Sequence, residues 1–147
     1  MRKQFIISIG CAILILSCSH LTIAEEAAQV VESKDQASVI GARNWLAMVD
    51  KKQFEQSWEI ASTYFKSLVT KEQWVSQAAA VRNPLGECIS RGLKTNLYQK
   101  TMPGAPDGEY YVLTFNAVFK NKTSATEIVT VMKDKDDQWR LAGYFIK

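Results

Sequence analysis

Arginine, tyrosine and carboxylate side chains carry most of the chemistry that this chain can offer. Its 147 residues include one histidine, His20, and three cysteines, Cys11, Cys18 and Cys88. Histidine is the usual general base, and histidine and cysteine are the usual zinc ligands. Of these four residues only Cys88 lies outside the first 24 residues, which have the pattern of an export signal. The sequence therefore predicts no metal, no other cofactor and no catalytic site built on histidine.

Arg91 has the position that most needs an explanation. Alternating apolar residues predict a strand here, and strict alternation places Arg91 on the face that the rest of the fold should cover. A guanidinium group stays charged there, so it needs a carboxylate, backbone carbonyls or an anionic ligand. Two alternatives follow: an internal ion pair, or an anchor for a ligand carboxylate or phosphate. The residues that share its predicted face are Ile89, Leu93, Thr95 and Leu97, and the candidate internal partners are Glu59, Asp50 and Glu109.

Four further residues are candidates for binding a ligand. Arg82 lies in the last turn of a predicted helix, where a cation complements the helix dipole. It could also form an anion clamp with Arg91, because both flank the same turn. Trp58 and Trp74 fall on apolar stripes typical of core residues, and they could instead line the mouth of a pocket. Tyr144 alternates away from the apolar residues of its strand, which places it on a face open to solvent or a partner.

The carboxylates show no spacing typical of a catalytic pair. Asp50, Glu55 and Glu59 lie near apolar helix faces, and nothing in their spacing indicates a pair with one raised pKa. Asp50 falls where the first predicted helix ends, which favours a connector role. The acidic residues between 134 and 137 lack the glycine and the distant glutamate of a calcium loop, so they predict a solvated hairpin turn.

Three helices are predicted before any strand. Apolar residues at spacings of three and four indicate helices over 39–49, 54–68 and 70–84. The third begins with the capping-box pattern Thr70-Lys71-Glu72-Gln73 and ends at Pro84. The apolar residues of the first two stripes are Val39, Ala42, Leu46 and Val49, then Phe54, Trp58, Ala61, Phe65 and Leu68.

After Gly86 the apolar period changes from helical to two, which predicts four strands. They cover 89–97, 111–119, 127–132 and 139–146, and short turns join them. Sequential strands on short turns favour an antiparallel sheet. The predicted fold class is α+β, with three N-terminal helices packed on a curved four-stranded antiparallel sheet.

The first 24 residues are predicted to direct export. Arg2 and Lys3 precede an apolar run over 5–16, and Thr22-Ile23-Ala24 then gives the small residues of a cleavage site. An alternative site is the lipobox-like Ile15-Leu16-Ser17-Cys18, in which Cys18 would carry the lipid. The apolar run is short of the roughly 20 residues of a membrane span, so none is expected in the mature protein. Residues 25–36 are predicted to form a polar leader, and residues 37–147 are predicted to form a single α+β domain.

The charge balance argues against a nucleic-acid partner. The full chain has 18 basic and 15 acidic residues, a net charge of +3, and two of the positive charges are Arg2 and Lys3 of the signal segment. The remaining charges are nearly balanced and mixed along the sequence. Nucleic-acid binding needs a concentrated basic surface, which this pattern does not provide.

Several short motifs along the chain form a recognisable combination. They are Trp45 to Asp50, Ser57-Trp58, Glu72-Gln73-Trp74, Arg82-Asn83-Pro84-Leu85-Gly86, Ser90-Arg91, Pro103 to Tyr110, and Gly143-Tyr144-Phe145. Together they resemble a bacterial family, the domain of unknown function 4019. This resemblance implies a small exported protein, and the wider nuclear-transport-factor-like or cystatin-like superfamily implies a cone with an interior pocket. The family has no established activity, so the resemblance adds more to the fold than to function.

Three functions are compatible with the sequence. The favoured one is a non-enzymatic module of the cell envelope that binds a small anionic or apolar ligand, or a partner protein. The second is a small isomerase or hydrolase that uses a pocket carboxylate with Arg91 or Tyr144 stabilising an oxyanion. The third is a structural module that dimerises through its open sheet face.

Export with cleavage after Ala24 predicts a periplasmic chain that begins at Glu25 and carries no lipid. Intact mass spectrometry of the protein purified from its own cells measures this directly. A mass corresponding to a diacylated chain that begins at Cys18 would contradict cleavage after Ala24 and identify a lipoprotein.

Overall fold

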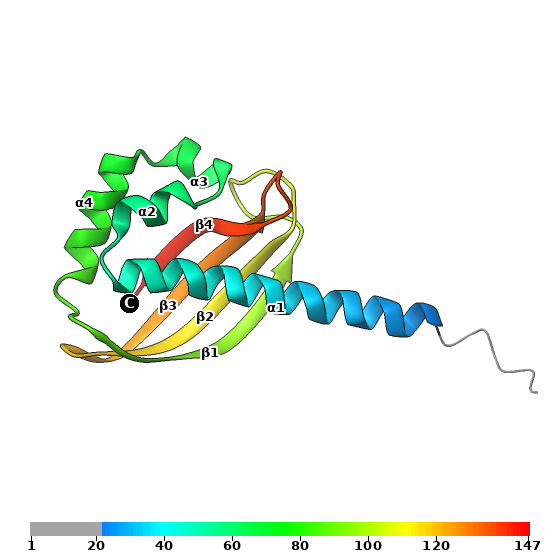
Figure 1. Ribbon diagram of the computed structural model, residues 1–147, viewed down its shortest axis with the longest axis horizontal. Coiled ribbons are helices and arrows are strands. Elements are labelled where there is room, and N and C mark those ends of the chain that lie inside the picture. The colour runs from blue at the N-terminus through cyan, green and yellow to red at the C-terminus, as the bar shows by residue number, and fades with distance from the viewer. Residues whose placement is uncertain (1–21) are drawn as a thin grey trace, which may run out of the picture.

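The computed structural model describes residues 22–147, and it has the predicted α+β class with every helix preceding the sheet. Residues 1–21, most of the predicted signal segment, lie outside the described residues. The four strands form one open antiparallel sheet in the order β1-β2-β3-β4 (Figure 1). The elements are α1 (Thr22–Asp50), α2 (Phe54–Glu59), α3 (Thr63–Leu68), α4 (Lys71–Arg82), β1 (Cys88–Gln99), β2 (Tyr110–Phe119), β3 (Lys122–Lys133) and β4 (Trp139–Ile146).

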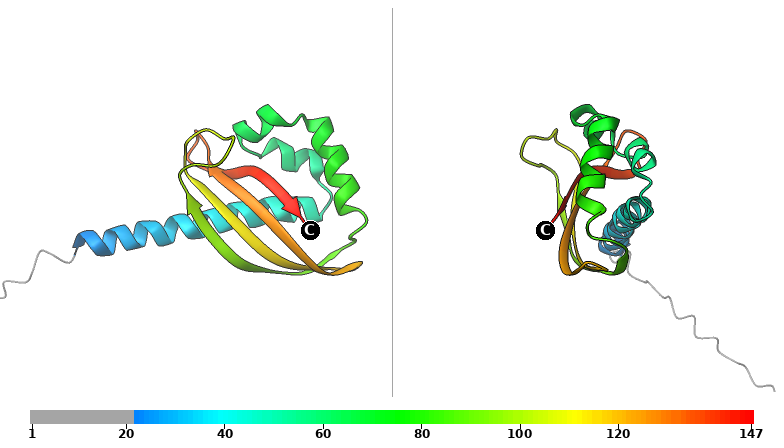
Figure 2. Two further views of the ribbon diagram at one scale, coloured as in Figure 1. Left: turned by 180° about the vertical axis from the view of Figure 1, so that it is seen from behind. Right: turned by 90° about the vertical axis from the view of Figure 1, so that its left-hand side faces the viewer.

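Helix α1 lies across one face of the curved sheet, and its N-terminal part extends beyond the sheet (Figures 1 and 2). Residues 25–36, expected as a polar leader, belong to this helix. The shorter helices α2, α3 and α4 lie beside the C-terminal part of α1 and the β4 side of the sheet (Figure 2). Among residues 22–147, none of the helices combines the length and the apolar character that crossing a membrane requires.

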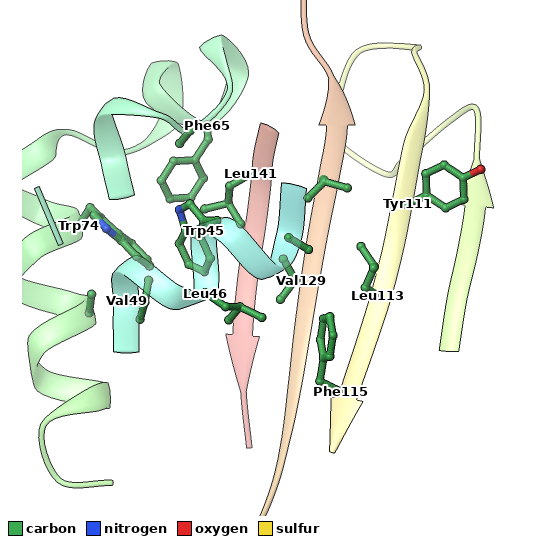
Figure 3. Close-up of a cluster of buried hydrophobic side chains, with 14 of the residues drawn as sticks. Trp45, Leu46, Val49, Phe65, Trp74, Tyr111, Leu113, Phe115, Val129 and Leu141 are labelled. Atoms are coloured by element: carbon green, nitrogen blue, oxygen red, sulfur yellow. The ribbon is translucent and has the colours of Figure 1, made fainter. Parts of the chain in front are cut away.

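The core lies between α1 and the inner face of the sheet (Figure 3). Burial of these large side chains supplies most of the stabilisation, at about 25 cal/mol per Å² of apolar surface. The members labelled in Figure 3 are Trp45, Leu46 and Val49 from α1, Phe65 and Trp74 from the shorter helices, and Tyr111, Leu113, Phe115, Val129 and Leu141 from the sheet.

The structure has four helices where three were predicted, because residues 54–68 form two. The break falls at Ser62, whose hydroxyl accepts a hydrogen bond from the Phe65 N–H at 3.0 Å and so caps α3. The backbone N–H of Ser62 donates to the Leu141 carbonyl of β4 at 2.8 Å. Serine is a preferred helix N-cap, and this signal outweighs the continuous apolar stripe. The capping box at the start of α4 is confirmed: Thr70 and Gln73 bond each other in both directions, at 3.0 and 3.3 Å.

Two β-bulges in β1 change which residues face the core. The pairing with β2 shifts between Cys88 and Ser90 and again between Leu93 and Thr95. Each extra residue inverts the alternation of side chains that follows it. Arg91 and Leu93 share the helix-facing side, as predicted. Ile89 and Leu97 do not, since they are 61% and 55% exposed. The inward-facing residues of β1 are Cys88, Arg91, Leu93, Asn96 and Tyr98, which pair with the inward row of β2.

A third register shift in β4 reverses the expected orientation of Tyr144. Leu141 pairs with Val131 and Gly143 pairs with Thr130, so Ala142 is the extra residue. Beyond it Tyr144 faces the helices, and Phe145 turns outward with 57% of its surface exposed. The prediction that Tyr144 lies on an open face is therefore wrong, because it assumed unbroken alternation.

Gly41 sets the approach of α1 to β4. A Cβ atom at this position would lie 2.6 Å from the backbone carbonyl oxygen of Trp139. We expect Gly41→Ala to lower the free energy of unfolding by about 1–3 kcal/mol through overpacking, despite the higher helix propensity of alanine. The matched control is Gly92→Ala, because a Cβ on Gly92 meets nothing within 4 Å. Chemical denaturation measures both, and a Gly41→Ala protein as stable as the wild type would contradict this packing.

Candidate functional site

Four charged side chains meet at the end of the sheet where β1 begins. We call them the ion-pair quartet; they are Asp50 at the end of α1, Arg82 in the last turn of α4, Arg91 of β1 and Glu127 of β3. Each residue comes from a different element, so the ion pairs connect the C-terminal ends of α1 and α4 to strands β1 and β3. The structure therefore brings both candidate arginines to one place.

The quartet is a closed ring in which each arginine contacts both carboxylates. Arg82 donates from Nη1 to Glu127 Oε1 at 2.9 Å, and from Nη2 to Asp50 Oδ1. Arg91 donates from Nη1 and Nη2 to the two oxygens of Asp50 at 2.7 and 2.9 Å, and from Nε to Glu127 Oε2 at 2.5 Å. Bidentate arginine–carboxylate pairs of this kind are the strong, geometrically specific ones.

The ring is electrically neutral and largely removed from water. The side chains of Glu127 and Arg82 are 0% and 4% exposed, and Asp50 is the most exposed member. Burial disfavours the charged form of Arg91, yet its hydrogen bonds to Asp50 and Glu127 outweigh that effect and hold its pKa above the usual value. Buried charges require this kind of mutual compensation, since each would otherwise carry a large desolvation penalty.

Tyr144 joins the quartet to the aromatic part of the core. Its hydroxyl donates to Glu127 Oε1 at 2.7 Å and accepts from Arg82 Nη1 at 3.3 Å. Its ring lies 5.1 Å from Trp45 and 6.3 Å from Trp74, centroid to centroid. Burial raises the pKa of Tyr144, and the negative charge of Glu127 raises it further. The phenol therefore stays neutral and serves as a hydrogen-bond donor.

Of the three candidate partners for Arg91, the structure selects Asp50. Glu59 instead pairs with Lys71, and Glu109 pairs with Lys34. The internal ion pair is thus present, and carboxylates of the chain occupy the space between the arginines where an anion clamp was considered. Asp50 lies at the end of α1, where a connector role was predicted, and it is also a member of the quartet.

Trp58 is separate from this group. Its indole N–H donates to the Val69 carbonyl at 2.8 Å, and the ammonium groups of Lys66 and Lys71 lie over its ring at 5.7 and 5.4 Å. These contacts give it a packing role beside the short helices. Trp74 is different, because it packs against Tyr144 and also borders a cleft described below.

Glu127 is the member of the site that the sequence analysis missed. It begins the predicted third strand and shares the alternation of Ala125, Val129 and Val131, all of which are buried. A carboxylate on an apolar strand face needs a partner for the same reason that Arg91 does. Applying that argument to Glu127 would have identified an acid to pair with the arginine.

A cleft of about 170 Å³ lies between α4 and β4, next to the quartet. Most of its wall is apolar, and it includes two of the candidate binding residues, Trp74 and Tyr144. The lining residues are Trp74, Gln77, Ala78 and Val81 of α4, and Tyr144, Phe145 and Ile146 of β4. In the part of the chain that the structure describes, no three histidine, cysteine or carboxylate side chains are placed to hold a metal ion.

A family model described as "Protein of unknown function (DUF4019)" matches residues 41–144. The chain belongs to this family. The matched region contains the whole ion-pair quartet and most of the cleft. A search of curated proteins found no match.

Removing one charge from the quartet should destabilise the fold strongly. We expect Glu127→Gln to lower the free energy of unfolding by about 3–5 kcal/mol, because it leaves two buried guanidinium groups facing one carboxylate. The matched control is Asp137→Asn, the same acid-to-amide change in the exposed pair with Lys133, which should cost at most about 1 kcal/mol. Urea denaturation measures both, and equal effects of the two variants would contradict the structural role of the quartet.

Proposed function

We propose that the protein is a non-enzymatic binding module of the cell envelope, and that the α4–β4 cleft takes an apolar side chain of a partner protein. The observation that supports this proposal is the cleft itself, which is concave, mostly apolar and bounded by Trp74 and Tyr144. Its 170 Å³ is below the roughly 300–1,000 Å³ of sites that enclose a whole small molecule. A cleft of this size suits one apolar group of a larger partner.

The edge of β4 supports an extended segment as the occupant. β4 is the last strand of the sheet, and Lys147 exchanges both backbone hydrogen bonds with Thr126 of β3. Because antiparallel pairs alternate, the backbone polar groups of Tyr144 and Ile146 then point away from β3. Such an edge is a template for an added strand. A partner segment pairing there would present alternate side chains to the cleft.

The state of the quartet favours binding over catalysis. An isomerase or hydrolase would need Arg91 or Tyr144 to stabilise an oxyanion beside a carboxylate base. In the structure the Arg91 donors described above are bonded to Asp50 and Glu127, and the Tyr144 hydroxyl donates to Glu127. The same pairing makes an anionic ligand less suitable than an apolar one, since the guanidinium charges are already neutralised.

The test uses an acetylated and amidated pentapeptide with leucine at its centre and serine and threonine around it. We expect it to shift the NMR signals of the Trp74 indole N–H and of the Ile146 amide, and a peptide with alanine at the centre to shift them far less. Val81→Trp, which fills the exposed rim of the cleft, should abolish the shifts. Ser76→Trp adds the same side chain to the opposite face of α4 and should leave them intact.

Equal shifts in the Val81→Trp and wild-type proteins would overturn this site. The dimerising module is the competing candidate, favoured by Ile89, Leu97 and Phe145, which are exposed on the uncovered side of the sheet. A peptide-free protein that sediments as a dimer, and becomes a monomer when Leu97 is changed to lysine, would support that candidate in place of the binding module.

A further inference from the structure

A second cleft, of about 330 Å³, lies at the other end of the sheet, near the turn that joins β1 to β2. Lys34 and Asp35 of α1 form one wall, and Asn96 and Tyr98 of β1 with Tyr111 of β2 form the other. Every side chain in this lining has a polar group, although the surface of the cleft is mostly apolar, as it is in the α4–β4 cleft. The quartet and its aromatic neighbours belong to neither wall, so this cleft is a separate site.

Asn96 presents a buried acceptor that lacks a partner. Its Oδ1 atom is inaccessible to solvent and forms no hydrogen bond with the described residues. The bulge at Leu93/Thr95 turns Asn96 inward, where it sits opposite Leu113. Buried polar groups are nearly always satisfied, because an unsatisfied one costs the full desolvation of that group. A rotation of the Asn96 amide toward the cleft would let a hydrogen-bond donor there supply the missing partner.

Two tyrosine rings give the cleft an aromatic wall. Tyr98 and Tyr111 lie 5.2 Å apart, centroid to centroid, and Trp139 supports Tyr111 from 5.0 Å. Tyr98 is 39% exposed, so part of its ring is open to a ligand. Rings fixed in this way offer an apolar face together with hydroxyl groups at the edge.

The charged groups around the cleft select against anions. Glu109 accepts hydrogen bonds from Lys34 Nζ at 2.7 Å and from the Tyr98 hydroxyl at 3.3 Å. Burial and a hydrogen bond with Asp35 hold the pKa of Tyr111 above its usual value. The Lys34–Glu109 pair is neutral, so the Asp35 carboxylate leaves a net negative charge that disfavours a phosphate or carboxylate ligand. A neutral ligand with hydroxyl groups can use both the donors and the acceptors of this lining.

We propose that this cleft binds a neutral pyranose ring, either as a free sugar or as part of a glycan. The C–H face of the ring would pack on Tyr98 and Tyr111. Its hydroxyl groups would donate to the Asp35 carboxylate and accept from Lys34. One would also donate to Asn96 Oδ1 after the Asn96 side chain turns this atom, which is closed to solvent in the structure, toward the cleft. A sugar hydroxyl both donates and accepts, which matches the mixture of groups in this lining.

The experiment is an NMR titration of the full domain with methyl β-glucoside and with cellotetraose. We expect both to shift the side-chain amide signals of Asn96 and the backbone amides of Tyr98 and Tyr111. Tighter binding of cellotetraose would identify a glycan as the ligand, and equal affinity would identify a free sugar. Choline and inorganic phosphate serve as charged probes and should cause no shifts.

Asn96→Leu separates binding from folding. Leucine removes the unpaired acceptor beside Leu113, so thermal unfolding should occur at the same or a higher temperature, while affinity for the sugar falls about tenfold or more. Thr95→Val changes the neighbouring residue on the outer face of β1 and should leave affinity unchanged. Val81→Trp should also leave the affinity for the sugar unchanged. The two proposals can therefore fail independently, because each cleft is tested by its own variant.

Three results would overturn the proposal. The first is equal sugar affinity of the wild type and Asn96→Leu. The second is binding of choline or phosphate in place of the sugars. The third is the absence of sugar binding to the wild type, and a less stable Asn96→Leu protein would then indicate that an ordered water satisfies the amide.

Discussion

The need to neutralise four buried charges governs the arrangement of this domain. Asp50, Arg82, Arg91 and Glu127 reach the same point from four elements, and each would be costly to bury without the others. The position of α4 follows directly from this constraint. Its last turn must bring Arg82 to Glu127 and over the Phe119 ring, where the guanidinium carbon lies 4.5 Å from the centroid. Once α4 is held there, the cleft between it and β4 has fixed walls.

The same constraint decides which chemistry is available. Arginines and carboxylates in a protein interior often indicate catalysis or anion binding, and perturbed pKa values are used to find such sites. Here those groups satisfy one another, and Tyr144 completes the network as a donor to Glu127. The two clefts lie on either side of the quartet: one has an apolar wall beside α4, and the other has a tyrosine-rich wall with polar groups beside Lys34 and Asp35 of α1.

Much of the fold follows from local sequence signals. Apolar periodicity located the helices and strands, and the Thr70–Gln73 capping box marked the start of α4. The covered position of Arg91 also followed from its strand neighbours. The break at Ser62 could have been read from a serine that precedes a helical turn. The meeting of Asp50 and Glu127 at the same two arginines could not be read locally, because these carboxylates lie 77 positions apart in the sequence.

The register itself depends on bulges, which leave little trace in apolar periodicity, and both clefts depend on them. Unbroken alternation after Leu93 would turn Thr95 and Leu97 inward; the bulge places Asn96 and Tyr98 there instead and makes that end of the sheet polar. Unbroken alternation after Leu141 would direct Gly143 and Phe145 at the helices. No hydroxyl would then reach Glu127. Three inserted residues therefore convert an ordinary apolar sheet face into one that carries specific polar groups, because each bulge redirects the side chains that follow it.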